Sequence, residues 1–269
     1  MIRTAFRMIA LASLLVAPLG AQASLQWNFA RYDGSQVFAG DDFVSTGGAT
    51  TNVVANVSGW GDTGALVAGS STERLLEQGT VRSWSGLGVQ NAWEGFNVGA
   101  PNHSTDNYGR NDFVLFSFDQ AITLQTVTVG WTGTDSDITV LAYTGTDPLD
   151  LSANVYDENR PEALTRNGWS FIGHESNLSV GSPRSVNGGG VSSSYWLVGA
   201  YNDRIASAGW STENDYIKIA QLTGIASPPI PPSTVPEPAT LLLAALAVPL
   251  LRRVRRRDSG SRKASTAAA

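Results

Sequence analysis

Two adjacent stretches decide the fold class, Asp112–Asp119 (DFVLFSFD) and Ile122–Trp131 (ITLQTVTVGW). In the first stretch, five of the six positions between the two aspartates are apolar, which is typical of a largely buried strand. In the second, Ile122 and Leu124 alternate with Thr123, which is the two-residue period of a half-buried strand. The pair therefore predicts two successive β-strands.

The rest of the body follows the same pattern, since its β-branched and aromatic runs are separated by turn-forming residues and the chain holds 28 glycines. One helical turn or short helix is predicted at Thr72–Gln78. Further strands are predicted at Leu25–Tyr32, Thr51–Val57, Ala65–Gly69, Gly86–Val89, Ile138–Thr144, Gly168–Gly173, Ser194–Ala200 and Asp215–Leu222. We expect an all-β fold, an antiparallel, jelly-roll-like β-sandwich of roughly nine to eleven strands.

The domain boundaries follow from composition. Residues 24–226 show no strong internal boundary and are long enough for a single domain with its own core. The stretch 227–238 (SPPIPPSTVPEP) contains six prolines, which favour an extended linker. The sequence therefore predicts one β-sandwich domain followed by a proline-rich linker.

The N-terminus carries the pattern of a secretory signal peptide. Arginines precede a short apolar region at Ile9–Leu19, and Ala21 and Ala23 form an A-x-A cleavage site. Signal peptidase is expected to remove residues 1–23, so that the exported chain begins at Ser24.

The C-terminus has three parts in a fixed order: a Val235-Pro236-Glu237-Pro238 motif, an apolar run and a basic cluster. The apolar run, 239–251, is about 20 Å long as a helix, whereas a bilayer core is about 30 Å thick, so we expect a short transmembrane segment. The basic residues should keep 252–269 in the cytoplasm as a basic tail. The cluster consists of Arg252, Arg253, Arg255, Arg256 and Arg257.

This tail resembles the PEP-CTERM sorting signal of Gram-negative bacteria, although the extension Asp258–Ala269 departs from its usual end. The resemblance implies processing by an exosortase after transient insertion in the inner membrane, and residence at the cell surface or in the extracellular matrix of a biofilm. The alternative is an ordinary stop-transfer anchor. Body segments within 84–238 also resemble exosortase-dependent surface proteins, a family without a firmly assigned activity. These segments are Pro101–Asp112, Gly130–Gly145, Val191–Asn202 and Glu213–Ile219.

The body of the chain and its two ends differ in net charge. Residues 24–235 hold 9 Lys and Arg against 21 Asp and Glu, a net charge of −12, whereas the whole chain has −5. This balance argues against nucleic acid as a partner and favours Ca²⁺ or neutral glycans such as exopolysaccharide, although acidity that only keeps the protein soluble is the simpler alternative. The chain has no cysteine, so the fold has no disulfide to support it.

No catalytic motif survives inspection, and we assign no catalytic residue. The chain has two histidines, His103 and His174, without an H-E-x-x-H helix, and it has no G-x-S-x-G turn. A carboxylate pair for glycan hydrolysis cannot be selected from so many acidic residues. We therefore expect a protein that is not an enzyme, and keep a secreted carboxylate-based glycan hydrolase as an alternative.

Loop oxygens supply the candidate metal ligands. Asp106 and Asn107 lie in a polar loop, Asp135 and Asp137 follow a strand, and Asp215 begins another. Carboxylates and carbonyls in turns suit Ca²⁺, whereas the same side chains also cap turns by accepting bonds from nearby backbone N–H groups. Both interpretations remain open from the sequence.

Four tryptophans are candidates for glycan binding: Trp84, Trp93, Trp196 and Trp210. An exposed indole stacks on the apolar face of a sugar, whereas a buried one fills the core. The sequence thus leaves a non-enzymatic surface or matrix protein as the first hypothesis and a carbohydrate-binding module as the second.

Overall fold

The computed structural model describes residues 24–30, 36–37, 41–47, 52–94, 103–157 and 164–227. Within these ranges the chain forms β-strands and two 3-10 turns, η1 (Leu151–Ala153) and η2 (Thr165–Asn167), and no α-helix. The strands are β1 (Leu25–Asn28), β2 (Gln36–Val37), β3 (Asp42–Val44), β4 (Val54–Gly61), β5 (Glu73–Leu75), β6 (Glu77–Ser83), β7 (Leu87–Gln90), β8 (Thr105–Asp106), β9 (Asp112–Thr132), β10 (Ile138–Tyr143), β11 (Val155–Asp157), β12 (Trp169–Glu175), β13 (Arg184–Ser185), β14 (Ser193–Ala200) and β15 (Tyr216–Ala226).

The long strand β9 organises the fold. The sequence predicted two strands here, but the structure joins them into one strand of 21 residues. The sequence prediction ended the first strand at Asp119 because Asp119 and Gln120 are polar. In the structure both residues remain extended between the two apolar stretches. The first half of β9 pairs with β4 and β14, and the second half pairs with β15 and β13. One strand therefore links two parts of the sheet.

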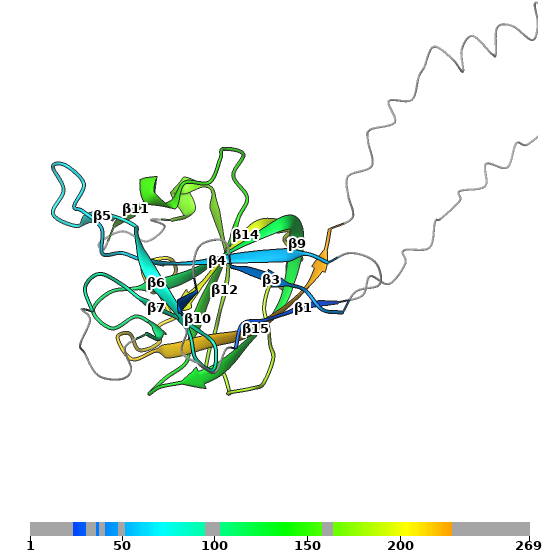
Figure 1. The fold of residues 1–269 in the computed structure, drawn as a ribbon. Helices are drawn as coiled ribbons and strands as arrows, with labels where there is room; N and C mark the ends of the chain where they lie inside the picture. Colours follow the sequence, from blue (N-terminus) through cyan, green and yellow to red (C-terminus); the bar gives the residue numbers. More distant parts are fainter. Residues whose placement is uncertain are drawn as a thin grey trace, which may run out of the picture. The chain divides into compact units, whose positions relative to one another are not determined.

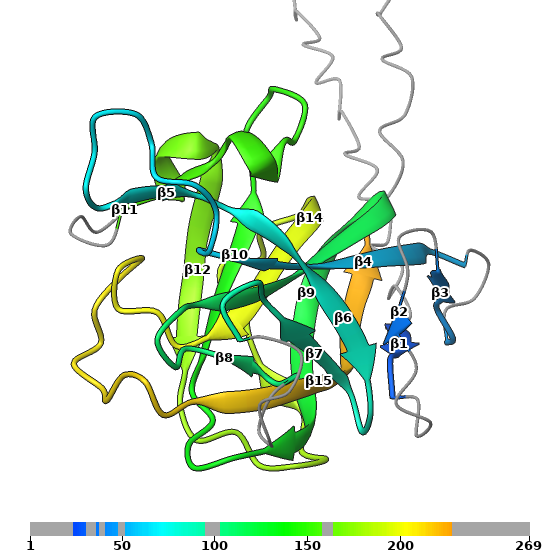
Figure 2. The same ribbon diagram turned by 60° about the vertical axis from the view of Figure 1, so that its left-hand side comes forward.

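Strand pairing closes five antiparallel strands into a barrel. The order β15–β7–β6–β4–β9 returns to its start because β9 also pairs with β15 (Figure 1). Strands β14, β10 and β12 continue the sheet outward from β9. They lie on the opposite side of the barrel from β1 and β3 (Figure 2). β5 and β11 form a separate two-stranded ribbon.

The all-β, antiparallel prediction is confirmed, whereas the jelly-roll-like sandwich is not the architecture that these pairings describe. Strand number and alternating apolar residues are shared by sandwiches and barrels. The two architectures differ in which strand edges pair, and the sequence pattern of a strand does not encode its partner.

Each barrel strand contributes a fully or nearly fully buried side chain to one core cluster, such as Val57, Val81, Val89, Phe116 and Ile219. Alternate residues of a strand point to opposite faces, so these side chains converge on the inside of the barrel. Removing a buried aromatic ring from such a core typically costs about 3–5 kcal/mol.

A second core cluster covers the other face of β9. Phe113 and Leu115 point away from the barrel interior and pack in a cluster with Tyr156, Trp169 and Leu197. This explains why the first half of β9 is apolar at nearly every position, since both of its faces are covered.

Several local predictions agree with the structure and two are wrong. The predicted strands that begin at Gly86, Ile138, Gly168, Ser194 and Asp215 are confirmed as β7, β10, β12, β14 and β15 within one or two residues at their starts. The predicted helix at Thr72–Gln78 is instead β5 and the start of β6, because these residues pair with β11 and β4. The predicted strand Ala65–Gly69 is a turn with one bridge at Leu66.

The predicted signal peptide with Ala21 and Ala23, the linker beyond Ser227, the Val235–Pro238 motif, the apolar run and the basic cluster lie outside the described residues. No helix in the described ranges is both long enough and apolar enough to span a membrane.

Candidate functional site

The candidate site lies around the segment that joins β8 to β9, and Asn107 makes its central hydrogen bonds. The Asn107 side chain donates from Nδ2 to the Tyr201 carbonyl and to Asp215 Oδ2, both at 2.8 Å. Its Oδ1 accepts from the Asp215 backbone N–H at 3.0 Å. Because all three bonds reach residues distant in sequence, this buried amide fixes the β8–β9 segment against β15 and the end of β14.

Asp135, Asp137 and Asp215, three predicted metal ligands, are brought together and are called the Asp215 cluster. One carboxylate oxygen from each lies within 4.8 Å of the others. Asp215 Oδ1 accepts from the Asp137 backbone N–H at 2.8 Å, and Asp137 Oδ1 accepts from the Asn177 N–H at 2.7 Å. Asp135 accepts from the Ser136 N–H and the Asn214 side chain. Backbone donors in turns therefore hold most of this cluster.

Burial, together with the charges of Asp137 and Asp135, raises the pKa of Asp215 to about 7, against the hydrogen bonds from the Asp137 N–H and Asn107. Burial also raises the pKa of Asp137. The hydrogen bonds that these carboxylates accept from turn N–H groups are capping contacts, the alternative to metal binding that the sequence left open.

The predicted ligand Asp106 lies in a different group, Glu94, Asp106 and Asp112, which is called the Asp112 cluster. One carboxylate oxygen of each residue again lies within 4.8 Å of the others. Asp106 accepts from the Ser104 hydroxyl at 2.9 Å and from the Tyr108 backbone N–H at 3.0 Å. Glu94, which lies in a turn after β7, was not among the predicted ligands. Asp112 was predicted only as the first residue of a buried strand.

All three carboxyls of the Asp112 cluster hold their protons more tightly than usual. Burial raises the pKa of Glu94 to about 7, with help from the Asp106 charge. Burial raises the pKa of Asp106 to about 6 against its hydrogen bonds. The pKa of Asp112 is raised strongly by burial and by the charges of Asp106 and Glu94. Perturbed groups of this kind are concentrated at functional sites in proteins.

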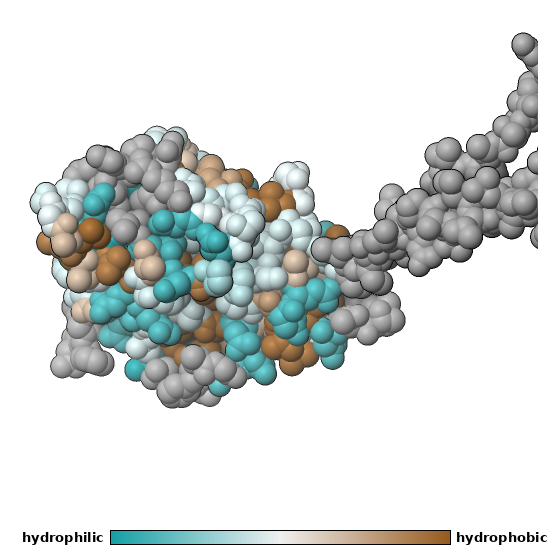
Figure 3. Space-filling model, turned by 90° about the horizontal axis from the view of Figure 1, so that it is seen from above, coloured by the Kyte–Doolittle hydropathy of each residue, from teal (hydrophilic) through white to brown (hydrophobic). Residues whose placement is uncertain are grey.

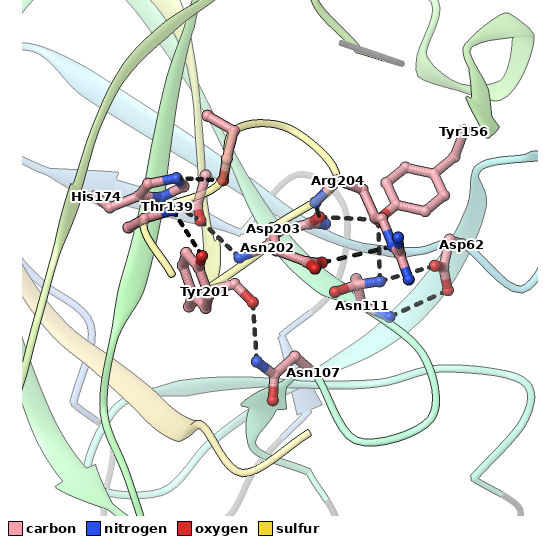
Figure 4. A network of polar contacts seen from close by, with 12 residues as sticks. Asp62, Asn107, Asn111, Thr139, Tyr156, His174, Tyr201, Asn202, Asp203 and Arg204 are labelled. Atoms are coloured by element: carbon pink, nitrogen blue, oxygen red, sulfur yellow. Dashed lines mark hydrogen bonds and ion pairs between the residues drawn. The ribbon is translucent and has the colours of Figure 1, made fainter. Parts of the chain in front are cut away.

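A polar cleft of about 220 Å³ lies beside these residues. Asp62 accepts from the backbone N–H and the side chain of Asn111 at 3.1 and 3.0 Å, and Asn111 also donates to the Tyr156 hydroxyl at 3.2 Å (Figure 4). Tyr156 donates to Asn202 Oδ1 at 2.9 Å, which also accepts from the Arg204 N–H. The lining groups suit hydroxyl-rich ligands, and the volume is below the ~300–1,000 Å³ of typical small-molecule sites.

The two histidines differ in their contacts, and among the described residues the buried Nδ1 of His103 has no hydrogen-bond partner. His174 bonds through Nδ1 to Thr139 and through Nε2 to the Ala206 carbonyl, and its ring packs against Tyr201 and Trp210. Burial lowers the pKa of His174, so the neutral ring is favoured. Burial lowers the pKa of His103 too, together with the charges of two basic residues.

The four candidate tryptophans differ in exposure. Trp84 and Trp93 are 63% and 58% exposed, and Trp210 is half-buried against Tyr201. Trp196 is fully buried in the barrel core, which corrects its assignment as a sugar platform, since a ligand cannot reach its ring. Figure 3 shows hydrophilic and hydrophobic residues interspersed on the face seen from above.

Trp93 lies next to the polar cleft. A Cβ added at Gly109, which lines the cleft, would be 2.8 Å from the Trp93 ring, so the indole packs directly on this glycine. Gly109 also has φ of +68°, which favours glycine. The adjacent Tyr108 is 56% exposed, so two accessible aromatic rings border the cleft.

No family model, curated protein or solved structure matches this chain.

Proposed function

We propose that this chain is an exported, non-enzymatic protein that an exosortase-type protease sorts to the cell surface or extracellular polymer matrix. The observation that carries the proposal is the order of the C-terminal parts: Val235-Pro236-Glu237-Pro238, a short apolar run and a basic cluster. An N-terminal signal peptide ending at Ala23 supports export. The apolar run is short for a permanent anchor, which favours removal of the tail.

The arrangement of carboxylates supports a role without catalysis. Glycosidases place two accessible carboxyl groups on either side of the scissile bond. In the Asp112 cluster, Asp106 and Asp112 are only 2% and 1% exposed, and Glu94 alone is partly open to solvent. A sugar chain does not reach two of these groups at once, so the hydrolase alternative gains no support from this cluster.

The test is the intact mass and cell fraction of the native protein in cells with and without the sorting protease. We expect a mature form that lacks residues 1–23 and the tail beyond Pro238, at the surface or in the matrix, and its loss without the protease. Glu237→Ala should block processing, whereas Pro232→Ala in the same linker serves as the matched control. An intact tail in the membrane fraction of both strains would refute the proposal.

Carbohydrate binding by the body is a second candidate, favoured by the two exposed rings beside the polar cleft. Trp93 and Tyr108 offer stacking surfaces, and the cleft offers hydrogen-bond donors and acceptors. Affinity for matrix polysaccharide should fall at least about tenfold in Trp93→Ala, which corresponds to about 1.4 kcal/mol. The equally exposed Trp84 lies in a different turn, so Trp84→Ala is the control. Equal loss in both variants, or no binding to any polysaccharide, would contradict this candidate.

A further inference from the structure

The Asp112 cluster joins three separate pieces of the chain. Glu94 lies in the turn after β7, Asp106 ends β8 and Asp112 begins β9. Asp106 is opposite Tyr216 in the β8–β15 ladder, and Asp112 is opposite Gly61 in the β4–β9 ladder. Two of the three carboxylates are therefore held on paired strands, and the third lies on a turn.

The cluster has an uncompensated polar atom in addition to its acidic composition. Asp112 is 1% exposed, and its Oδ1 accepts from the Asn91 side chain at 3.0 Å. Its Oδ2 is buried and has no hydrogen-bond partner among the residues that the structure describes. Leaving such an oxygen unpaired is costly, because water solvates it in the unfolded chain and none of the described groups replaces that water.

The charges around Asp112 add to the cost of burying this unpaired oxygen. Burial is the largest cause of the raised pKa of Asp112, and the charges of Asp106, Glu94 and Asp62 raise it as well. The hydrogen bond from Asn91 lowers it. No basic side chain is among these causes. A nearby positive charge would satisfy the unpaired oxygen and remove the repulsion between the three carboxylates.

We propose that Glu94, Asp106 and Asp112 bind one hard divalent cation, Ca²⁺. Ca²⁺ binds carboxylate oxygens at about 2.3–2.6 Å, so oxygens on opposite sides of one ion are about 4.8 Å apart. The three carboxylates meet this limit. The partly open Glu94 provides the entry side, and water would complete the coordination there. The proposal concerns the folded body and does not depend on export or sorting.

The Asp215 cluster supplies an internal comparison. It has the same number of carboxylates within the same distance, but both oxygens of Asp215 and both oxygens of Asp135 accept hydrogen bonds. Its charges are thus stabilised by donors already present in the fold. We therefore place the ion at the Asp112 cluster and use the Asp215 cluster as the control.

The first experiment uses the complete mature chain, with Tb³⁺ as a luminescent substitute for Ca²⁺. Trp93 precedes Glu94, so its indole should sensitise bound Tb³⁺, and Ca²⁺ should displace it. In parallel, a saturating Ca²⁺ concentration of 100 times Kd should raise Tm by about 5–10 °C over the chelated protein, because the ion binds only the native state.

The variants separate the two clusters. Glu94→Gln and Asp112→Asn should abolish both the luminescence and the Tm shift, whereas Asp135→Asn should keep both. Glu94 is partly exposed, so Glu94→Gln remains informative where the buried Asp112→Asn does not fold. Absence of luminescence and of a Tm shift at millimolar Ca²⁺ overturns the proposal. A response that Asp135→Asn abolishes and Glu94→Gln leaves intact also overturns it.

Discussion

Asp106→Asn should stabilise the cation-free protein more at pH 8 than at pH 5. Burial raises the pKa of Asp106 from 3.8 to about 6 in the fold. The folded protein therefore holds this proton more tightly than the unfolded chain does. The resulting stability is fully present below about pH 3.8 and is lost as the pH rises through about 6. Asparagine carries no charge at either pH, so the variant does not lose stability in this way.

The size of the effect follows from linkage. A difference of about 2 pKa units between the two states corresponds to about 3 kcal/mol over the full range. Between pH 5 and pH 8 the Asp106 contribution is about 1.4 kcal/mol. Removing this charge also relieves Glu94 and Asp112, whose pKa values it raises, so about 1.4 kcal/mol is a lower bound.

The assay is urea unfolding of the wild type and the variant at both pH values with a chelator present. Comparing the two proteins at each pH cancels the opposite contribution of His103 and His174, whose lowered pKa values favour neutral rings and destabilise the fold in acid. Asp42→Asn, at an exposed position on β3, should change stability by less than about 0.5 kcal/mol at either pH. If Asp106→Asn stabilises the protein equally at both pH values, or more at pH 5, this prediction is wrong.

Three further predictions concern stability. Phe116→Ala should reduce the free energy of unfolding by about 3–5 kcal/mol in chemical denaturation, because the ring is fully buried in the barrel. Asn107→Ala should cost about 2–4 kcal/mol and raise the pKa of Asp215, measurable by NMR titration, because Asp215 loses a hydrogen bond to its charged form. Gly109→Ala should lower stability by about 1–3 kcal/mol, because its backbone is left-handed and a ring packs on it. Gly188→Ala, with open space around it, is the control and should change stability by less than about 0.5 kcal/mol.

The candidate site was only partly predictable. Asp135 and Asp137 are two residues apart, so one turn places them together, and their association with Asp215 depends on a bridge between distant segments. Asp106 was recognised as a candidate ligand, but its actual neighbours were not. Asp112 belongs to an apolar strand pattern that concealed its role, and Glu94 stands alone in its turn.

The all-β class and the position of most long strands follow from the amino-acid sequence alone. Alternation reports which side of a strand is buried, because successive side chains point to opposite faces. The acidic charge of the body, and the order of the segments from which we predict export and sorting, are likewise local properties of composition.

The barrel and the acidic clusters depend on contacts between segments that are distant in the sequence. Closure requires β9 to pair with β15, and Ile122 and Ala226, which are opposite each other in this ladder, are 104 residues apart. Any strand edge presents the same backbone donors and acceptors, so the local sequence of a strand does not specify its partner. The β8–β15 pairing places Asn107 beside Asp215, and Asp106 of that ladder lies near Asp112 of the β4–β9 ladder. These groups meet because the strands that carry them are hydrogen-bonded in one register, which is a property of the whole fold.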